Sequence, residues 1–160
     1  MKYLTAAFLA LFLFGVLPLY AADLSDLTYT TTNSEVTITD CDEAATGELI
    51  IPDTIEGNPV TSIGDRAFYQ CRSLTGITIP DSVTSIGDEA FYQCRSLTDI
   101  TIPDGVTRIQ SGTFLNCTSL TAIALPETLI GIGQGAFSRC SSLTDINIPQ
   151  GVTAIIDFTF

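Results

Sequence analysis

Histidine is absent from this sequence of 160 residues. Imidazole is the commonest general base of enzymes, a frequent metal ligand and the usual pH switch near neutrality, so its absence argues against all three roles. The sequence also contains no CxxC pair that would support a zinc site, no P-loop and no dinucleotide-binding fingerprint. We therefore expect a protein that is not an enzyme and that uses no cofactor or metal.

Basic residues are scarce. The chain has 6 Lys and Arg against 18 Asp and Glu, which gives a formal net charge of -12. Such a surface repels phosphate backbones and anionic lipid head groups, so we expect no nucleic-acid partner and no membrane contact beyond a signal peptide. The 46% of hydrophobic residues is enough to bury the core of one domain.

The N-terminus differs in composition from the rest of the chain. Lys2 precedes an apolar run from Tyr3 to Leu17, and Pro18 separates this run from the small pair Ala21-Ala22. This layout predicts a secretory signal peptide over residues 1–22, cleaved near that pair, and hence a secreted or cell-surface protein. An uncleaved membrane anchor is the alternative, because about 20 apolar residues can span a bilayer.

A repeat of 23 residues dominates the chain beyond its N-terminal segment. Residues 65–87 and 88–110 are identical at 18 of 23 positions. The five residues 56–60 lengthen the loop of the first copy. The recurring prolines are Pro52, Pro80, Pro103, Pro126 and Pro149; the recurring phenylalanines are Phe68, Phe91, Phe114, Phe137 and Phe160; the recurring cysteines are Cys71, Cys94, Cys117 and Cys140. Self-similarity at such a period is typical of solenoids.

The first half of each copy reads as a short strand. Leu74, Ile77 and Ile79 have inward spacings, and Pro80 ends the strand because it cannot donate to a ladder. The expected strands of the parallel sheet lie around residues 49–51, 77–79, 100–102, 123–125 and 146–148.

The second half of each copy reads as the return path of the coil. Val83 and Ile86 are expected to point inward from an extended segment, and residues 87–94 to form one short helical turn that fills the coil with Ala90 and Phe91. The alternating segments 27–31 and 35–39 flank Thr32-Asn33-Ser34 and predict a β-hairpin.

The expected fold is thus an α/β solenoid, a right-handed stack of coils whose strands form a parallel sheet of about five strands, with short helical turns on the other side. The predicted divisions are a signal peptide at 1–22, an N-terminal β-hairpin cap at 23–45 and a solenoid at 46–160 whose last repeat is incomplete. The cap would cover the first coil, since solenoid ends need covering.

The pattern L-T-x-I-x-I-P-x-x-V-T-x-I-G-x-x-A-F-x-x-C-x-S resembles the BspA-like class of leucine-rich repeats over about residues 49–160. The resemblance implies a bacterial surface or secreted protein, in a family with several members linked to adhesion, and carries over no catalytic residue. Gln110 departs from the usual glycine, and Gly112-Thr113 replace the acid and alanine before Phe114.

The cysteines and acids each allow two interpretations. The recurring cysteines favour a reduced, buried column over disulfides, because pairing equivalent thiols on neighbouring coils would distort their register, and Cys41 is expected to be unpaired. The acidic run Asp40-Cys41-Asp42-Glu43 lacks a calcium-loop spacing and reads as a solvated loop. The acids that follow prolines, Asp81, Asp104 and Glu127, suit turn chemistry, with weak cation binding as the alternative.

Exposed strand positions are the expected binding surface. One column contains Glu48, Gly76, Asp99, Ala122 and Asp145; the other contains Ile50, Thr78, Thr101, Ala124 and Asn147. The candidate contact residues are Glu48, Thr78, Asp99, Thr101, Asp145 and Asn147. Acids on alternate strands would lie about 9.6 Å apart, too far to share a cation and poorly placed for glycosidase chemistry. Tyr69 and Tyr92 are expected to cover the coil edge, with a contact patch as the alternative.

These features predict an extracellular leucine-rich-repeat module for protein–protein interaction or adhesion. The alternatives are a glycan-binding module, which the lack of exposed aromatics on the strand columns disfavours, or the targeting part of a longer protein. Phe160 follows Pro149 by 11 residues, as Phe91 follows Pro80, so the sequence stops inside a repeat. We expect an uncapped C-terminal end that can mediate self-association.

Overall fold

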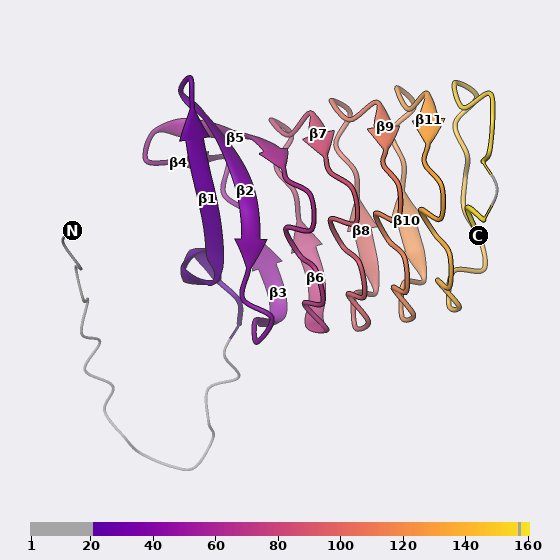
Figure 1. Cartoon of the computed structure of the whole chain (residues 1–160), viewed down its shortest axis with the longest axis horizontal. Helices are drawn as coiled ribbons and strands as arrows, with labels where there is room; N and C mark the ends of the chain where they lie inside the picture. Colours follow the sequence, from indigo (N-terminus) through magenta and orange to yellow (C-terminus); the bar gives the residue numbers. More distant parts are fainter. Residues whose placement is uncertain (1–20, 157) are drawn as a thin grey trace, which may run out of the picture.

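The computed structural model describes residues 21–156 and 158–160; residues 1–20, which carry most of the predicted signal peptide, lie outside them. Coils of similar shape stack side by side along the long axis, with the hairpin at one end and the C-terminus at the other (Figure 1). The elements are η1 (Leu24–Asp26), β1 (Leu27–Thr32), β2 (Glu35–Cys41), β3 (Thr46–Ile50), β4 (Thr54–Ile55), β5 (Asn58–Ile63), β6 (Ser73–Thr78), β7 (Ser85–Ile86), β8 (Asp99–Thr101), β9 (Arg108–Ile109), β10 (Ala122–Ala124) and β11 (Gly131–Ile132).

The predicted parallel sheet is present in four strands. Its order is β10-β8-β6-β3, so each strand lies beside the strand one repeat away. In this register Leu49 is opposite Ile77, and Ile100 is opposite Ile123. Their side chains point into the coil, as the period-two pattern predicts, and Leu49 is fully buried. We call this sheet the strand face.

A second row of short parallel strands was not predicted. For residues 83–86 and their equivalents the sequence predicts only an extended segment. In the structure β7 pairs with β5, and β11 pairs with β9. The row is visible in Figure 1 as β7, β9 and β11 lying side by side. Strands of two residues carry too little pattern to be recognised in a sequence.

The prediction of helical turns is wrong. Residues 65–71 and their equivalents form consecutive turns, and η1 is the one helical element among residues 21–156 and 158–160. Arg66 and Gln70 have φ values of 59° and 62°, and their equivalents Glu89 and Gln93 have 54° and 59°. A left-handed residue at every fourth position cannot continue a right-handed helix. We call this third side of the solenoid the turn face.

Backbone hydrogen bonds on the turn face alternate between two uses. The amides of Arg66, Phe68 and Gln70 donate to the next coil, and the last of these bonds, to Tyr92, is 2.8 Å long. The amides between them donate backward within their own turn, as Tyr69 does to Arg66 at 2.9 Å. Every backbone donor from Arg66 to Cys71 therefore has a partner, although the stretch is neither helix nor strand.

The hairpin expected near the N-terminus is present. Strands β1 and β2 pair antiparallel. Asn33 and Ser34 join them with φ values of 53° and 62°, as a two-residue hairpin turn with positive φ at both positions requires. Strand β2 also pairs in parallel with β5, and its residues Val36 and Ile38 are fully buried. The domain boundaries at 22 and 45, and the capping role, stay predictions.

The core is a stack of equivalent side chains. Phe68, Phe91 and Phe114 are fully buried, and consecutive rings are stacked with centroids 5.2 Å apart. Val83 and Ile86 are buried as predicted. Because each ring covers the next, a repeat buries its apolar residues only through its neighbours.

The fifth predicted strand is not formed. Residues 146–148 are described without strand structure, and Ile146 and Ile148 are only partly buried. The second row continues one step further as a single bridge between Ile132 and Ile155. No helix among the described residues is long and apolar enough to cross a membrane.

Candidate functional site

Four of the six predicted contact residues lie on the strand face. Glu48 is on β3, Thr78 on β6, and Asp99 and Thr101 on β8, and all four are exposed. Pairing of β3 with β6 sets Glu48 opposite Gly76, and pairing of β6 with β8 sets Gly76 opposite Asp99. The two carboxylates therefore lie two strands apart, about 9.6 Å by the strand spacing.

The other two predicted contact residues are placed differently. Asp145 and Asn147 are exposed, but they lie in the segment that forms no strand, so the sheet does not hold them in the columns. The structure therefore brings together Glu48, Thr78, Asp99 and Thr101 and leaves Asp145 and Asn147 outside the rigid surface.

The acidic column is open and its side chains lean along the sheet. The Glu48 side chain lies against the face of Gly76, because Glu48 Cγ is 3.4 Å from the point that a Cβ there would occupy. Thr98 donates its hydroxyl to Asp99 Oδ2 at 2.8 Å. Among the described residues no group of three or more His, Cys, Asp or Glu side chains could hold a metal ion. The column therefore presents separate carboxylates to solvent.

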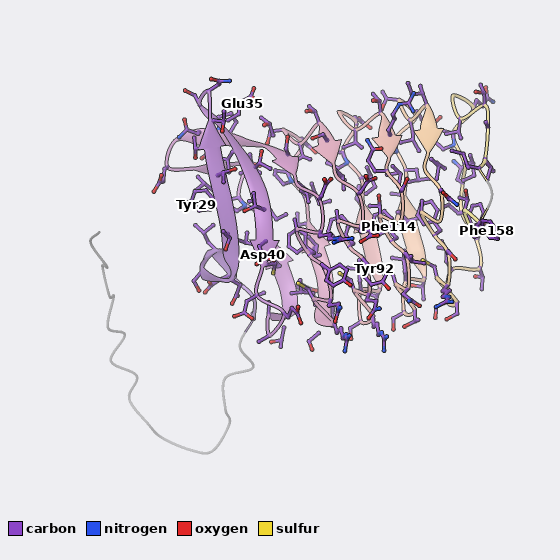
Figure 2. The ribbon with its side chains drawn as sticks, in the orientation of Figure 1. Tyr29, Glu35, Asp40, Tyr92, Phe114 and Phe158 are labelled. Atoms are coloured by element: carbon purple, nitrogen blue, oxygen red, sulfur yellow. The ribbon has the colours of Figure 1, made fainter. Side chains whose placement is uncertain are left out.

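The turn face carries a pair of stacked tyrosines. The rings of Tyr69 and Tyr92 have centroids 4.9 Å apart at an interplanar angle of 9°, and both residues are half-buried. The Arg66 guanidinium lies over the Tyr69 ring, 5.6 Å from its centroid. Tyr92 lies midway along the solenoid, far from Tyr29 at one end and Phe158 at the other (Figure 2). Because the Tyr69 ring already packs against Tyr92 and Arg66, it is not the open aromatic platform that a sugar ring needs.

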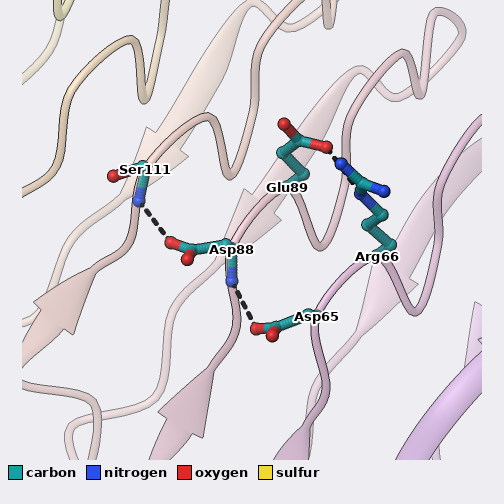
Figure 3. Close-up of polar contacts among 5 residues, drawn as sticks. All are labelled: Asp65, Arg66, Asp88, Glu89 and Ser111. Carbon is teal, nitrogen blue, oxygen red and sulfur yellow. Dashed lines mark hydrogen bonds and ion pairs between the residues drawn. The ribbon is translucent and has the colours of Figure 1, made fainter.

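Aspartates at the start of these turns link consecutive coils (Figure 3). Asp65 accepts a hydrogen bond from the Asp88 amide at 2.9 Å, and Asp88 accepts one from the Ser111 amide at 3.0 Å. Gly87 makes room for this contact, since a Cβ there would overlap Asp65 Oδ1. The two aspartates therefore have a structural role in the stack.

These aspartates also border a shallow depression over the second row of strands. Its volume is about 530 Å³. It is lined by Thr37, Ser62, Ile63, Gly64, Asp65, Ser85, Ile86, Gly87, Asp88 and Gln110. Ser85 donates to the Ser62 hydroxyl at 3.0 Å, so part of its polar lining is already paired.

The cysteines form the buried column that the sequence predicts, and none of the five is disulfide-bonded. Cys94 donates its thiol to the Phe68 carbonyl at 3.1 Å, and Cys117 donates to Phe91 at 3.1 Å. Burial raises the pKa of Cys94 and Cys117 well above the usual range, and raises that of Cys140 to about 11. A thiol with a raised pKa is a poor nucleophile at neutral pH, so the column is structural.

Cys71 is the exception within this column. Its pKa is raised first by a hydrogen bond with the Cys41 side chain and then by burial. Its thiol lies 3.6 Å from the Cys41 carbonyl, which joins the first coil to the end of the hairpin. Sequence reasoning treated Cys41 as separate from the column, because only the fold brings residues 41 and 71 together.

Parallel rows of strands joined by turns, with one residue type repeated at each inward position, define a β-solenoid repeat protein of about four turns. Residues 47–160 match the family described as BspA type leucine-rich repeat region, in 6 copies. The chain belongs to this family, as the repeat pattern indicates. Leucine-rich repeats of this kind are protein-binding modules and are typically non-catalytic.

Two solved bacterial structures resemble this chain closely. The T. pallidum leucine-rich-repeat protein TpLRR has 34% identity and a TM-score of 0.76, over 84% of this chain and 63% of that one. A leucine-rich repeat protein from Bacteroides ovatus has 36% identity and a TM-score of 0.75, over 88% of this chain and 38% of that one. This chain therefore spans less than two thirds of either relative. No curated protein matches the sequence.

Proposed function

We propose that the chain is an extracellular protein-binding module that serves in adhesion, and that the strand face is its contact surface. The family supports protein binding. The apolar run near the N-terminus, from Tyr3 to Leu17, supports export.

The observation that carries the proposal is the register of the exposed columns. Neighbouring strands hold Glu48 and Asp99 in one column and Thr78 and Thr101 in the other, on a backbone fixed by parallel pairing. A rigid surface loses little conformational entropy on binding. The carboxylates select a partner with lysines or arginines at the contact, by charge complementarity.

The test uses the full chain immobilised against a panel of purified extracellular proteins. Asp99→Lys should weaken the binding of a partner found in this panel by about tenfold or more, because it opposes like charges at the contact. Asp81→Lys is the matched control: Asp81 is exposed in the turn after Pro80, so the charge change is the same away from the strand face.

Equal losses for Asp99→Lys and Asp81→Lys would show that only the net charge matters and would contradict the strand face as the contact. A glycan array run in parallel separates the two classes of ligand. Glycan binding without any protein partner would favour the glycan-binding alternative. Labelling of the chain on intact cells tests its export.

A further inference from the structure

Two arginines that directly follow the turn face in successive repeats converge on one neutral acceptor. Arg72 and Arg95 occupy equivalent positions in successive repeats, and both are exposed. Each donates an Nη2 hydrogen bond to Gln93 Oε1, in both cases at 3.2 Å. Arg72 Nη2 also lies 2.5 Å from Gln70 Oε1. Because both Nη2 atoms contact the same oxygen, they are at most twice 3.2 Å, or about 6.4 Å, apart.

The positive charge of this pair is not neutralised. Within the described part of the chain the single ion pair is Arg66 with Glu89, at 2.7 Å. The acceptors that hold Arg72 and Arg95 are amides, although the chain contains 18 acidic residues that could have served there. Gln70 and Gln93 thus position the guanidiniums and leave their charge available.

The backbone beneath the pair is fixed. Gln70 and Gln93 have φ values of 62° and 59°, and their amides donate to the next coil, to Tyr92 at 2.8 Å and to Leu115 at 2.9 Å. The stacked Tyr69 and Tyr92 directly precede the two glutamines. This arrangement orders the acceptors before any ligand arrives, which lowers the entropy lost on binding.

We propose that Arg72 and Arg95, held by Gln70 and Gln93, bind the carboxylates of an extended acidic segment of a partner protein. A planar guanidinium binds a carboxylate through two parallel hydrogen bonds. In an extended segment, acids at alternate positions are roughly 6.7 Å apart on one side, slightly more than the upper limit on the separation of the two Nη2 atoms, and rotation of the glutamate side chains brings the carboxylates closer together.

The charge of the whole chain restricts the ligand further. A net charge of -12 repels any anionic partner, and it repels most strongly those whose charge is high and continuous, such as sulfated polysaccharides and nucleic acids. Two local guanidiniums suffice for two carboxylates. This site lies outside the strand face and has the opposite sign, so it does not depend on the proposal for that face.

The experiment follows the Nε–Hε signals of the arginines by NMR while the full chain is titrated with acetyl-Gly-Glu-Gly-Glu-Gly-amide. The signals of Arg72 and Arg95 should shift saturably, and that of Arg139 should not. Arg72→Gln should weaken the apparent affinity by about fivefold, the upper range for an exposed ion pair. Arg66→Gln is the matched control and should leave the affinity unchanged, because Arg66 is already paired with Glu89.

Gln93→Glu provides the sharpest test, because a carboxylate at this position would neutralise both guanidiniums from within. It should abolish binding of the peptide without unfolding the protein, as checked by its melting temperature. Asp99→Lys should leave peptide binding intact, which separates this site from the strand face.

Three results would overturn the proposal. The glutamine peptide acetyl-Gly-Gln-Gly-Gln-Gly-amide could produce the same shifts, which would exclude a charge-based site. The Gln93→Glu variant could retain its affinity. A sulfated oligosaccharide could bind Arg72 and Arg95 more tightly than the acidic peptide, which would assign the site to glycans.

Discussion

The strand segments of the coil at residues 88–110 and of the last described coil have nearly the same sequence but different structures. Residues 97–103 read LTDITIP and residues 143–149 read LTDINIP, a difference of one side chain. The first contains strand β8, paired on both sides, whereas the second contains no strand. The turn face behaves differently, because its hydrogen bonds between coils continue into the last described residues: the Phe137 amide donates to the Thr159 carbonyl at 2.7 Å.

This difference shows that the two faces depend on their neighbours to different degrees. The turn face has left-handed residues and hydrogen bonds inside each turn, so its conformation is partly local. A parallel strand has hydrogen bonds only to other strands and apolar contacts only to adjacent coils. The strand face therefore forms only where coils cover it, as the partly buried Leu143 and Ile146 indicate.

The largest expected effect separates the central from the terminal rings. Phe91→Ala should lower the free energy of unfolding by about 3–5 kcal/mol, because the ring is fully buried between two others. Phe160→Ala should cost much less, since Phe160 is 56% exposed and Phe137 is its one ring partner among the described residues. Urea unfolding measures both. Tyr92→Ala is the control at the neighbouring half-buried position. A cost equal to that of Phe91→Ala would contradict our assignment of Phe91, and not Tyr92, as the side chain that points into the coil.

Alkaline pH should destabilise the buried cysteine column. The pKa of Cys140 rises from 9.0 to about 11 on folding, so its stabilising contribution is complete below pH 9 and is lost as the pH rises toward 11. Each buried thiol contributes a loss of about 1.4 kcal/mol per pH unit in its window. Urea unfolding at pH 8 and pH 10.5 measures this loss of stability. The variant Cys117→Ala should lose less, because burial also raises the pKa of Cys117 and the variant removes the contribution of this thiol. An unchanged slope in this variant would contradict titration of the column.

Removal of one thiol should have a smaller effect. Cys94→Ala should cost about 1–2 kcal/mol through lost packing and the lost hydrogen bond to the Phe68 carbonyl. Reductant should leave the melting temperature unchanged, because the cysteines are not disulfide-bonded. A large fall in melting temperature with reductant would show that disulfides hold the fold in solution.

The smallest energetic effect concerns the last coil. Amide hydrogen exchange should be fast at residues 146–148 and slow at residues 100–102, because only the latter contain strand pairing. The exposed Ile155, Ile156, Phe158 and Phe160 lead us to expect concentration-dependent self-association, relieved by appending a polar capping repeat. Sedimentation that shows a monomer at high concentration, together with protected amides at 146–148, would contradict both expectations.

Much of the fold was predictable from the sequence. The 23-residue period set the stacking of coils, and alternation within Leu74-Thr-Gly-Ile-Thr-Ile79 assigned the inward side chains of the strand face. The repeat also placed Phe and Cys in buried columns and aligned Glu48 with Asp99 across Gly76. These inferences succeeded because a fixed repeat places equivalent residues in equivalent environments, whatever the details of the turns.

The tertiary structure alone decided the rest. Arg66 and Gln70 are not residue types that signal a left-handed φ, so the sequence of their own repeat suggests a helical turn; only the equivalent positions in later repeats, Gly112, Gly135 and Asn116, carry residue types that favour positive φ. The Cys41–Cys71 contact joins residues 30 positions apart, and the contact of Arg72 with Gln93 joins residues 21 positions apart. The missing strand at 146–148 differs from β8 in its neighbours, and pairing across coils cannot be read from one repeat, because its stabilising contacts belong to the next.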